Sequence, residues 1–298
     1  MNKVIICGLG ALGLTYAVKL QGRCDDLRIL VDEERLQRYK INPPVFNGVK
    51  KSFNYILPTD KLSADLIIIS TKSAGLASAI ANIKNFVTPD TRIISLLNGI
   101  TSEEKIAEVY PEAKIIKSYF IGHSAVRFGN EVTQDGIGKI VTESDEKLEK
   151  FLSDAGIDYS VAEDINYSVW LKYLLNLFSN QTSAILNMTF GEMKNSKSFK
   201  LFAEKIIDEV VPIANAMGVK YTEKLKNDAI NSLSLACDDG KTSMLQDILS
   251  KRKTEVDILA GEVIKLGEKY NIPTPYNRAL YDLIKIKEEQ NEYSIHSR

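Results

Sequence analysis

The chain has 298 residues, 44% hydrophobic residues and a formal net charge of −1. This near-neutral charge argues against a general affinity for nucleic acid or anionic membranes, and no apolar run is as long as a membrane span. The length exceeds what one hydrophobic core usually serves, so we expect two domains. The two histidines, His123 and His296, are too far apart in sequence to suggest a metal site, and we expect none. The first predicted strand follows Met1 directly and the three cysteines have no CxxC spacing, so we expect a cytoplasmic protein without a signal peptide.

A glycine-rich turn near the N-terminus is the first motif in the chain. Residues 4–7 are an apolar run typical of a strand buried on both faces, and residues 14–20 have the spacing of an amphipathic helix. The first glycine of a GxGxxG motif allows a tight turn, the second lets the backbone approach a pyrophosphate, and the third lets the helix pack closely on the strand. The order strand, turn, helix therefore predicts a dinucleotide site formed by Gly8, Leu9, Gly10, Ala11, Leu12 and Gly13.

Short apolar strands then alternate with helices up to about residue 165. We predict strands at 27–31, 65–70, 91–97 and 114–119 and helices at 74–86 and 102–109. Alternating strands and helices imply a parallel sheet with right-handed crossovers, which is a Rossmann-type α/β fold. Turn signals at 129–130 and 135–136 indicate antiparallel strands within 129–141.

The second part of the chain has almost no strand pattern. Helical periodicity covers 166–186, 197–217, 222–237, 253–270 and 275–288, with Gly218 and Asn271 at expected helix ends. We therefore predict a dinucleotide-binding Rossmann domain at residues 1–165 and an all-helical substrate-binding domain at 166–298. The cleft between two such domains is the expected place for an active site.

Polar side chains follow three of the predicted strands. Asp32 ends the second strand, where an acidic side chain can bind the adenosine ribose and favour NAD. It can equally be a solvated residue that begins a helix at Glu33, and Arg35 could serve a 2′-phosphate, so the choice between NAD and NADP stays open. Lys72 and Asn98 follow two buried strands, where side chains point into the ligand crevice. The alternatives are a surface lysine and an ordinary Asn-Gly turn.

One helix of the second domain carries a narrow polar stripe. Lys172, Asn176 and Asn180 are spaced four residues apart and share one face of an otherwise apolar helix. Partly buried polar groups need partners, and a polar ligand would supply them. The alternative is that the stripe is the solvent edge of a core helix.

A second polar cluster covers 242–247 and 252–255. We expect Glu255 on a long helix, bordering an apolar stripe. There it would be either a cleft carboxylate beside Lys172 or an exposed residue paired with Lys251, four positions earlier.

The whole chain resembles the ketopantoate reductases (2-dehydropantoate 2-reductases). The resemblance is carried by GLGALG, Lys72, Asn98-Gly99, Trp170-Leu171-Lys172 with Asn176 and Asn180, and SMLQDI followed by KRKTEVDILAG. It implies NADPH-dependent reduction of 2-dehydropantoate to pantoate, on the route to pantothenate and coenzyme A. It further implies the roles of single residues: Lys172 as general acid, Glu255 as its assistant and a substrate contact, Asn98, Asn176, Asn180 and Ser243 as substrate or cofactor contacts, and Lys72 near the nicotinamide and phosphates.

Two positions depart from the family pattern. The second strand ends in acidic residues where members often have a basic one, so NAD stays an alternative to NADP. Phe190 stands where several members have Asn, which leaves room for a different 2-keto acid. The alternative functions are therefore a related dehydrogenase for another 2-keto or hydroxy acid and a non-catalytic dinucleotide-binding sensor. The expected partner is a small 2-keto acid substrate, with no nucleic acid and no membrane, and a homodimer stays open.

Overall fold

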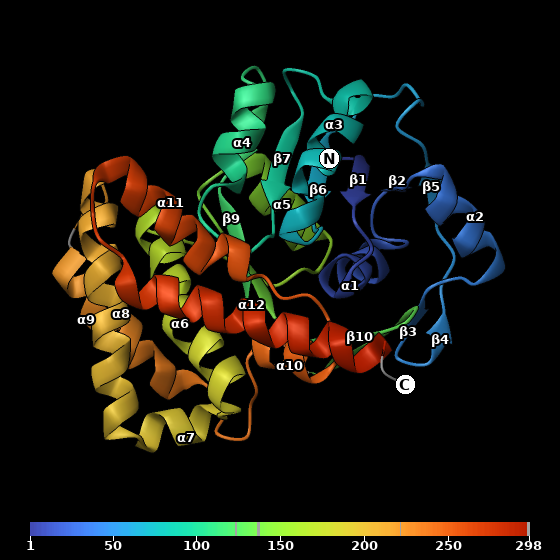
Figure 1. Ribbon diagram of the computed structural model, residues 1–298. Coiled ribbons are helices and arrows are strands. Elements are labelled where there is room, and N and C mark those ends of the chain that lie inside the picture. Colours follow the sequence, from blue (N-terminus) through green and yellow to red (C-terminus); the bar gives the residue numbers. More distant parts are fainter. Residues whose placement is uncertain (123, 136–137, 221, 297–298) are drawn as a thin grey trace. The chain divides into compact units, whose positions relative to one another are not determined.

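The computed structural model describes residues 1–122, 124–135, 138–220 and 222–296. The chain forms two compact units, Met1–Ile165 and Asn166–Arg298, and each is described by itself (Figure 1). The first unit is built on strands and the second on helices, so the α/β fold class predicted for the chain is confirmed.

A six-stranded parallel sheet forms the centre of the first unit, in the order β5-β2-β1-β6-β7-β8. Its strands are β1 (Lys3–Cys7), β2 (Asp26–Leu30), β5 (Asn54–Ile56), β6 (Leu66–Ile69), β7 (Arg92–Ser95) and β8 (Lys114–Ile116). The order of strands reverses between β1 and β6. Ligands of open α/β sheets bind beyond the carboxyl ends of the strands at such a reversal.

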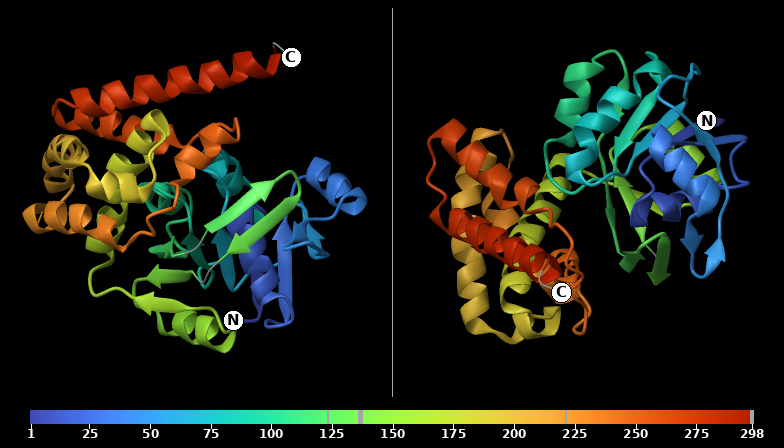
Figure 2. Two further views of the ribbon diagram at one scale, coloured as in Figure 1. Left: turned by 90° about the horizontal axis from the view of Figure 1, so that it is seen from below. Right: turned by 45° about the vertical axis from the view of Figure 1, so that its right-hand side comes forward.

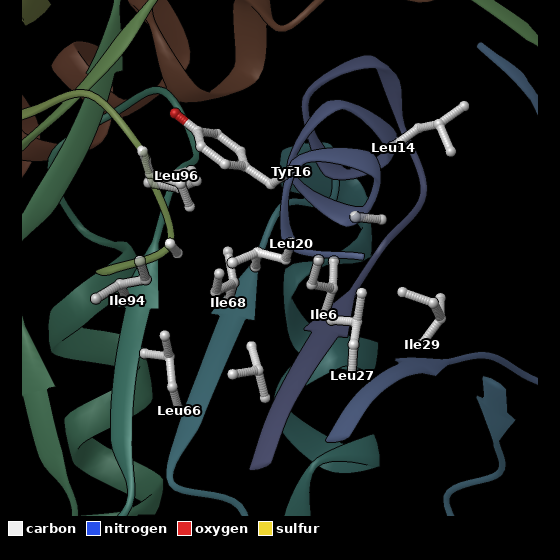
Figure 3. Close-up of a cluster of buried hydrophobic side chains, with 14 of the residues drawn as sticks. Ile6, Leu14, Tyr16, Leu20, Leu27, Ile29, Leu66, Ile68, Ile94 and Leu96 are labelled. Atoms are coloured by element: carbon white, nitrogen blue, oxygen red, sulfur yellow. The ribbon is translucent and has the colours of Figure 1, made fainter. Parts of the chain in front are cut away.

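Hydrophobic side chains cover both faces of this sheet because successive residues of a strand point to opposite sides. Val4 and Ile6 of β1 pack toward α1 (Ala11–Leu20), whereas Ile5 and Cys7 pack toward α3 (Leu76–Asn82) and α4 (Ser102–Val109). Figure 3 shows the first of these clusters, in which Ile6 and Ile68 of the sheet face Leu20 of α1. Each such buried aliphatic side chain contributes about 1.5–3 kcal/mol, so the sheet is a rigid base for the turns at its edge.

Several further elements of the first unit accompany this sheet. They are α2 (Glu33–Ile41), α5 (Glu146–Asp154), β3 (Val45–Phe46), β4 (Val49–Lys50), β10 (Ser124–Phe128), β11 (Glu131–Asp135), and the 3-10 turns η1 (Ser73–Gly75) and η2 (Lys84–Phe86). The hairpin β10–β11 is antiparallel, as the turn signal at 129–130 predicts. Gly136, in the second predicted turn, and His123 lie outside the described residues.

The predicted strand at 114–119 is wrong as one element. It is divided into β8 and β9 (Ser118–Ile121), and β9 leaves the parallel sheet to pair antiparallel with β12 (Lys139–Thr142), which also pairs with β13 (Tyr159–Val161). The switch occurs at Lys117, whose backbone N–H donates to the Glu143 carboxylate at 2.7 Å. The hydroxyls of Ser118 and Thr142 then bond at 2.9 Å, which stabilises the new pairing.

The second unit consists of helices, and α12 runs along one side of it (Figure 2). The helices are α6 (Ile165–Leu186), α7 (Phe190–Asn195), α8 (Lys197–Ala216), α9 (Thr222–Ser232), α10 (Ser243–Leu249), α11 (Ala260–Tyr270) and α12 (Pro275–His296), with the 3-10 turns η3 (Leu233–Leu235) and η4 (Val256–Ile258). Gly218 and Asn271 follow α8 and α11 with positive φ values of 81° and 57°, the conformation that ends helices at the predicted places.

The helix predicted over 253–270 is wrong in its first part. The α-helix begins only at Ala260, and residues 252–255 are irregular. Lys251 has φ 52°, and the N–H of Arg252 donates back to the carbonyl of Asp247 at 2.8 Å, which closes α10. The polar groups of Thr254 are then bonded to the Glu288 carboxylate of α12 instead of to helical neighbours.

Candidate active site

The glycine turn after β1 is packed against the end of β6. Gly8 has φ 102°, and a Cβ atom added there would lie 2.9 Å from the backbone N of Thr71. A Cβ on Gly13 would lie 1.9 Å from the Gly8 carbonyl oxygen and 2.5 Å from Ser70 Oγ. Gly8 and Gly13 are therefore required by the chain's own packing.

Gly10 has more room. The nearest atom to a Cβ added there is the Ser70 carbonyl oxygen, at 3.6 Å, which is an ordinary contact. Its φ of −68° and ψ of −167° are open to any residue. The absence of a side chain at Gly10 therefore leaves the surface beside the turn open to a ligand.

The N-terminus of α1 suits a phosphate. Among the described residues, no side chain caps this end of the helix, and its first turn has no acidic residue. The first helical bond runs from Leu14 N–H to the Gly10 carbonyl, so the N–H groups of the preceding residues have no helical acceptor. Free N–H groups and the positive end of the helix dipole bind anions. The turn therefore fits the pyrophosphate of a dinucleotide.

Replacing Gly10 with Ala is expected to weaken cofactor binding without weakening the fold. The added methyl group meets no protein atom closer than 3.6 Å but occupies the surface that a pyrophosphate would approach. We expect the Kd for NADPH or NADH to rise about tenfold or more, which corresponds to about 1.4 kcal/mol. Cofactor fluorescence titration and thermal unfolding measure the two effects. An unchanged Kd would mean that no cofactor lies over Gly10.

Two side chains that the sequence does not single out hold the glycine turn. Ser70, the residue after β6, donates from Oγ to the Gly8 carbonyl at 2.8 Å. Arg127, on the hairpin strand β10, donates from Nη1 to the Leu9 carbonyl and from Nε to the Gly129 carbonyl at 2.9 Å. The place of Ser70 at the end of a buried strand was a usable signal. Arg127 had none, because it lies far along the chain from the turn.

Cys7 ends β1 immediately before the glycine turn. Burial raises the pKa of its thiol to about 12, against a smaller opposing effect of Arg35, so the thiol stays protonated. Cys7 is therefore part of the apolar core and not a nucleophile.

The other predicted residues of the first unit follow further strands of the same parallel sheet. Asp32 follows β2, Lys72 follows β6 and Asn98 follows β7, and parallel strands end at the same edge of a sheet. Lys72 is exposed at the start of η1, and Asn98 is half-buried before Gly99, whose φ is 105°. The fold thus brings these predicted segments to the edge that carries the glycine turn.

Asp32 caps the N-terminus of the helix that follows it, α2. Its carboxylate accepts from the backbone N of Arg35 at 2.7 Å and from Arg35 Nη1 at 2.6 Å, and α2 begins at Glu33 as the helix-start alternative predicts. Both side chains of this pair remain about half exposed. The Asp32 carboxylate and the Arg35 guanidinium thus lie together at the end of β2, where the adenosine ribose or its 2′-phosphate would bind.

The polar stripe of α6 is partly buried. Lys172 and Asn176 are half-buried and Asn180 is only 6% exposed. Their apolar neighbours on the helix are in the core, namely Trp170, Tyr173, Leu174, Leu177 and Phe178. Further polar residues on the same helix are also buried, namely Ser179, Gln181, Thr182 and Ser183. Several of these buried groups are satisfied within the helix, as in the bond from Ser179 Oγ to the Leu175 carbonyl at 2.6 Å.

Hydrogen bonds hold two other predicted segments against α6. Ser183 bonds through its hydroxyl to Thr242, the residue that caps α10 just before the exposed Ser243. Tyr173 donates from its hydroxyl to the Leu259 carbonyl at 2.9 Å, four residues after Glu255. The segments of Ser243 and Glu255 are therefore each bonded to α6, at points ten residues apart on that helix.

Glu255 is half-buried in the irregular segment before η4. It is not on an α-helix, so the predicted helical placement of Glu255 is wrong. Among the described residues, no group of three or more His, Cys, Asp or Glu side chains could hold a metal ion. Of the described helices, none combines the length with the apolar character that a membrane span needs.

Sequence models of a known family match both units. The model described as "Ketopantoate reductase PanE/ApbA" matches residues 4–146, and the one described as "Ketopantoate reductase PanE/ApbA C terminal" matches residues 164–288. The chain belongs to the ketopantoate reductase family. Members of this family are nicotinamide-dependent, so the protein is an NAD(P)H-dependent oxidoreductase, and the alternative of a non-catalytic sensor is not favoured.

Individual relatives agree with the family. The chain is 28% identical to the 2-dehydropantoate 2-reductase of Streptococcus pyogenes serotype M3, over 96% of this chain and 97% of that protein. Its fold is similar to a D-mandelate dehydrogenase solved with NADH and anilino(oxo)acetate, with a TM-score of 0.84 and 25% identity over 97% of this chain and 99% of the other. It is also similar to a dimeric ketopantoate reductase from Staphylococcus aureus, with a TM-score of 0.77 and 21% identity over 97% and 99% of the two chains.

Proposed function

We propose that the protein is a 2-dehydropantoate 2-reductase, which reduces 2-dehydropantoate to pantoate in pantothenate and coenzyme A biosynthesis. The observation that carries the proposal is the partly buried Lys172–Asn176–Asn180 stripe on α6, in a chain whose family is named for this reaction. A lysine next to neutral amides in a mostly apolar helix suits the binding of a small anionic substrate with a reactive carbonyl.

Each candidate residue has a proposed role in binding or in catalysis. A bound nicotinamide cofactor would supply the hydride. The glycine turn and the N-terminus of α1 bind its pyrophosphate, and Lys72 and Asn98 contact the cofactor or substrate from the same sheet edge. Lys172 stabilises the developing charge on the C2 oxygen of the substrate and donates the proton from Nζ. Glu255 holds Lys172 and accepts from the substrate hydroxyl, while Asn176, Asn180 and Ser243 bind the carboxylate and the same hydroxyl.

The deciding experiment is the rate of nicotinamide oxidation with 2-dehydropantoate, followed by absorbance with NADPH and with NADH. We expect turnover well above that with 2-oxo acids that lack the branched hydroxyl-bearing side chain. The same assay is run with a panel of other 2-oxo acids. A higher rate with one of them would show that it is the substrate, and the proposed reaction class would stand.

Phe190 supports one such alternative substrate class. Its ring lies 3.0 Å from the position that a Cβ on Gly240 would take, and its N–H donates to the Gly240 carbonyl at 3.0 Å, on the segment that leads to Ser243. An apolar ring here favours an apolar or aromatic 2-oxo acid, and the similar D-mandelate dehydrogenase was solved with anilino(oxo)acetate. An aryl 2-oxo acid therefore belongs in the panel.

Arg35 is the residue that we propose to recognise NADPH. Its guanidinium stands beside Asp32 at the end of β2 and would turn from that carboxylate to the 2′-phosphate. Without the phosphate, Asp32 would bind the ribose hydroxyls of NADH. NADPH is the proposed cofactor because the family reaction implies it.

Replacing Arg35 with Ala is expected to lower the ratio of kcat/KM for NADPH to that for NADH by about tenfold. One charge-assisted hydrogen bond contributes about 1.5–3 kcal/mol, and 1.4 kcal/mol is a factor of ten. Arg38→Ala is the matched control, since Arg38 is exposed on the same helix and carries the same charge. If both variants keep the wild-type ratio, Arg35 does not read the phosphate.

We further propose that the protein acts in the cytoplasm, without nucleic acid or membrane partners, and assembles as a homodimer. The dimeric state of the similar Staphylococcus aureus protein supports the last point. Light scattering on the purified full chain tests it.

A further inference from the structure

The segment that carries Glu255 is held by the last helix of the chain. The backbone N–H and the Oγ1 hydroxyl of Thr254 both donate to one oxygen of the Glu288 carboxylate on α12, each at 2.6 Å. Thr254 is 6% and Glu288 8% exposed. Hydrogen bonds to an ionised, buried carboxylate are among the stronger ones in proteins. The residue before Glu255 is therefore fixed to α12.

A second attachment lies two residues after Glu255. Asp257 accepts from the Tyr281 hydroxyl at 2.9 Å and is paired with Lys285 Nζ at 3.0 Å. Partial burial pushes the pKa of Asp257 upward, but the hydrogen bonds from Lys285 and Tyr281 outweigh this and hold the pKa below its usual value. The same Lys285 also lies 3.4 Å from the other carboxylate oxygen of Glu288, so the two attachments are joined.

The anchoring side chains share one face of α12. Tyr281, Lys285 and Glu288 are spaced at i, i+4 and i+7. Between the attachments, the N–H of Val256 donates to Thr254 Oγ1 at 3.3 Å, and the N–H of Ile258 donates to the Glu255 carbonyl at 3.2 Å. Glu255 thus lies in a short arch, residues 254–257, whose two ends are bonded to α12.

The first turn of α12 is itself fixed in the second unit. The buried carboxylate of Glu209 on α8 accepts from the backbone N of Tyr276 at 2.6 Å, and from N and Nδ2 of Asn277 at 3.0 and 2.8 Å. Farther along α12, Asn291 donates from Nδ2 to the Ile248 carbonyl of α10 at 3.0 Å. The helix that holds the arch is therefore anchored to α8 and α10.

Stability alone does not explain a buried carboxylate at position 288. Burying a charge is costly, and apolar replacements of buried ionic groups are often neutral or stabilising. The Glu288 carboxylate instead accepts two hydrogen bonds from Thr254, the neighbour of Glu255. Both bonds form at once only in one orientation of Thr254, so they fix the backbone that leads to Glu255. This geometry suits the placement of the adjacent side chain.

We propose that Glu288 is the positioning residue for Glu255, acting through Thr254. The proposal rests on the proposed function, in which Glu255 holds Lys172 and contacts the substrate. Glu288 itself touches neither substrate nor cofactor in this proposal. Its removal should therefore act on turnover through Glu255 and leave cofactor binding unchanged.

The test compares Glu288→Ala with Glu289→Ala, in which the exposed neighbour on the same helix loses the same charge. We expect Glu288→Ala to lower kcat by about tenfold or more, because a small misplacement of a reacting group can cost a factor of up to about 100. The Kd for NADPH should stay within about twofold of wild type, and Glu289→Ala should match wild type. Glu288→Gln should recover part of kcat, since its amide oxygen can still accept both bonds.

The decisive measurement repeats Glu288→Ala in a Glu255→Ala background. If Glu288 acts through Glu255, the second substitution changes kcat less than about twofold there, whereas independent effects would multiply. Equal losses in both backgrounds, or full activity of a folded Glu288→Ala protein, overturn the proposal. Thr254→Val removes both bonds of the hydroxyl, to Glu288 and from the Val256 N–H, and keeps the backbone bond to Glu288. Should Glu288→Ala fail to fold, Thr254→Val takes the place of Glu288→Ala in both backgrounds, with the same outcomes.

The failure of this inference and that of the proposed function look different. If Glu255→Ala keeps the wild-type rate with every 2-oxo acid that the protein reduces, both the role of Glu255 and its positioning by Glu288 are wrong. If Glu255→Ala loses activity while Glu288→Ala and Thr254→Val keep it, only the positioning role is wrong.

Discussion

Replacing Lys172 with Ala is expected to lower kcat by about 100-fold or more. General acid catalysis by a positioned side chain contributes about 10²–10⁴-fold, and the alanine variant loses both the proton donor and the positive charge beside the developing oxyanion. Steady-state kinetics with 2-dehydropantoate and the preferred nicotinamide measure the loss. The Kd for the cofactor should change little, because the glycine turn belongs to the other unit.

Two further variants separate the roles of Lys172. Lys172→Arg keeps the charge but is a poor acid near neutral pH, so it should recover only part of the rate. Lys200→Ala removes an exposed lysine of α8 and should leave kcat unchanged. A Lys172→Ala protein that reduces its substrate at a near-normal rate would remove the lysine from the mechanism.

Replacing Gly13 with Ala is expected to destabilise the first unit strongly, by about 3 kcal/mol or more. The new Cβ would lie 1.9 Å from the Gly8 carbonyl oxygen, a backbone atom that cannot move without opening the glycine turn. Overpacking a well-packed site costs about 1–3 kcal/mol, and more where backbone must shift. Denaturant unfolding of the full chain, followed by a signal from the first unit, measures the change.

Gly10→Ala is the matched control for Gly13→Ala, because its Cβ has no neighbour closer than 3.6 Å. Combining Gly13→Ala with Ser70→Ala should restore little stability, since the side-chain contact is relieved and the backbone contact stays. Equal stability of Gly13→Ala and wild type would contradict the close packing of α1 on the glycine turn.

Much of the first unit follows from local features of the sequence. Apolar runs such as residues 4–7 predict strands buried on both faces, because neither alternating face can tolerate a polar residue. The turn after β1 is encoded by glycines whose conformations and contacts other residues cannot adopt, as at Gly8. The helix over 102–109 and the helix ends at Gly218 and Asn271 are confirmed for the same reason, since each depends on its immediate neighbours.

The candidate site residues were accessible from sequence to different degrees. Lys172, Asn176 and Asn180 stand out because a helix repeats every 3.6 residues, so their spacing puts them on one face. Their catalytic and binding roles, like those of Asp32, Lys72, Asn98, Ser243 and Glu255, stay predictions that the experiments above test.

The sequence by itself determined the parallel sheet, the glycine turn and the helical second unit, because these depend on patterns within a few consecutive residues. Only the tertiary structure decided that the chain changes sheet at Lys117 and that Glu255 lies on an irregular arch instead of a helix. It also revealed that Arg127 bonds to the glycine turn and that Glu288 accepts from Thr254, 34 residues away in sequence. Hydrogen bonds between distant residues overrule local helical periodicity there, and such bonds leave no periodic trace in the chain.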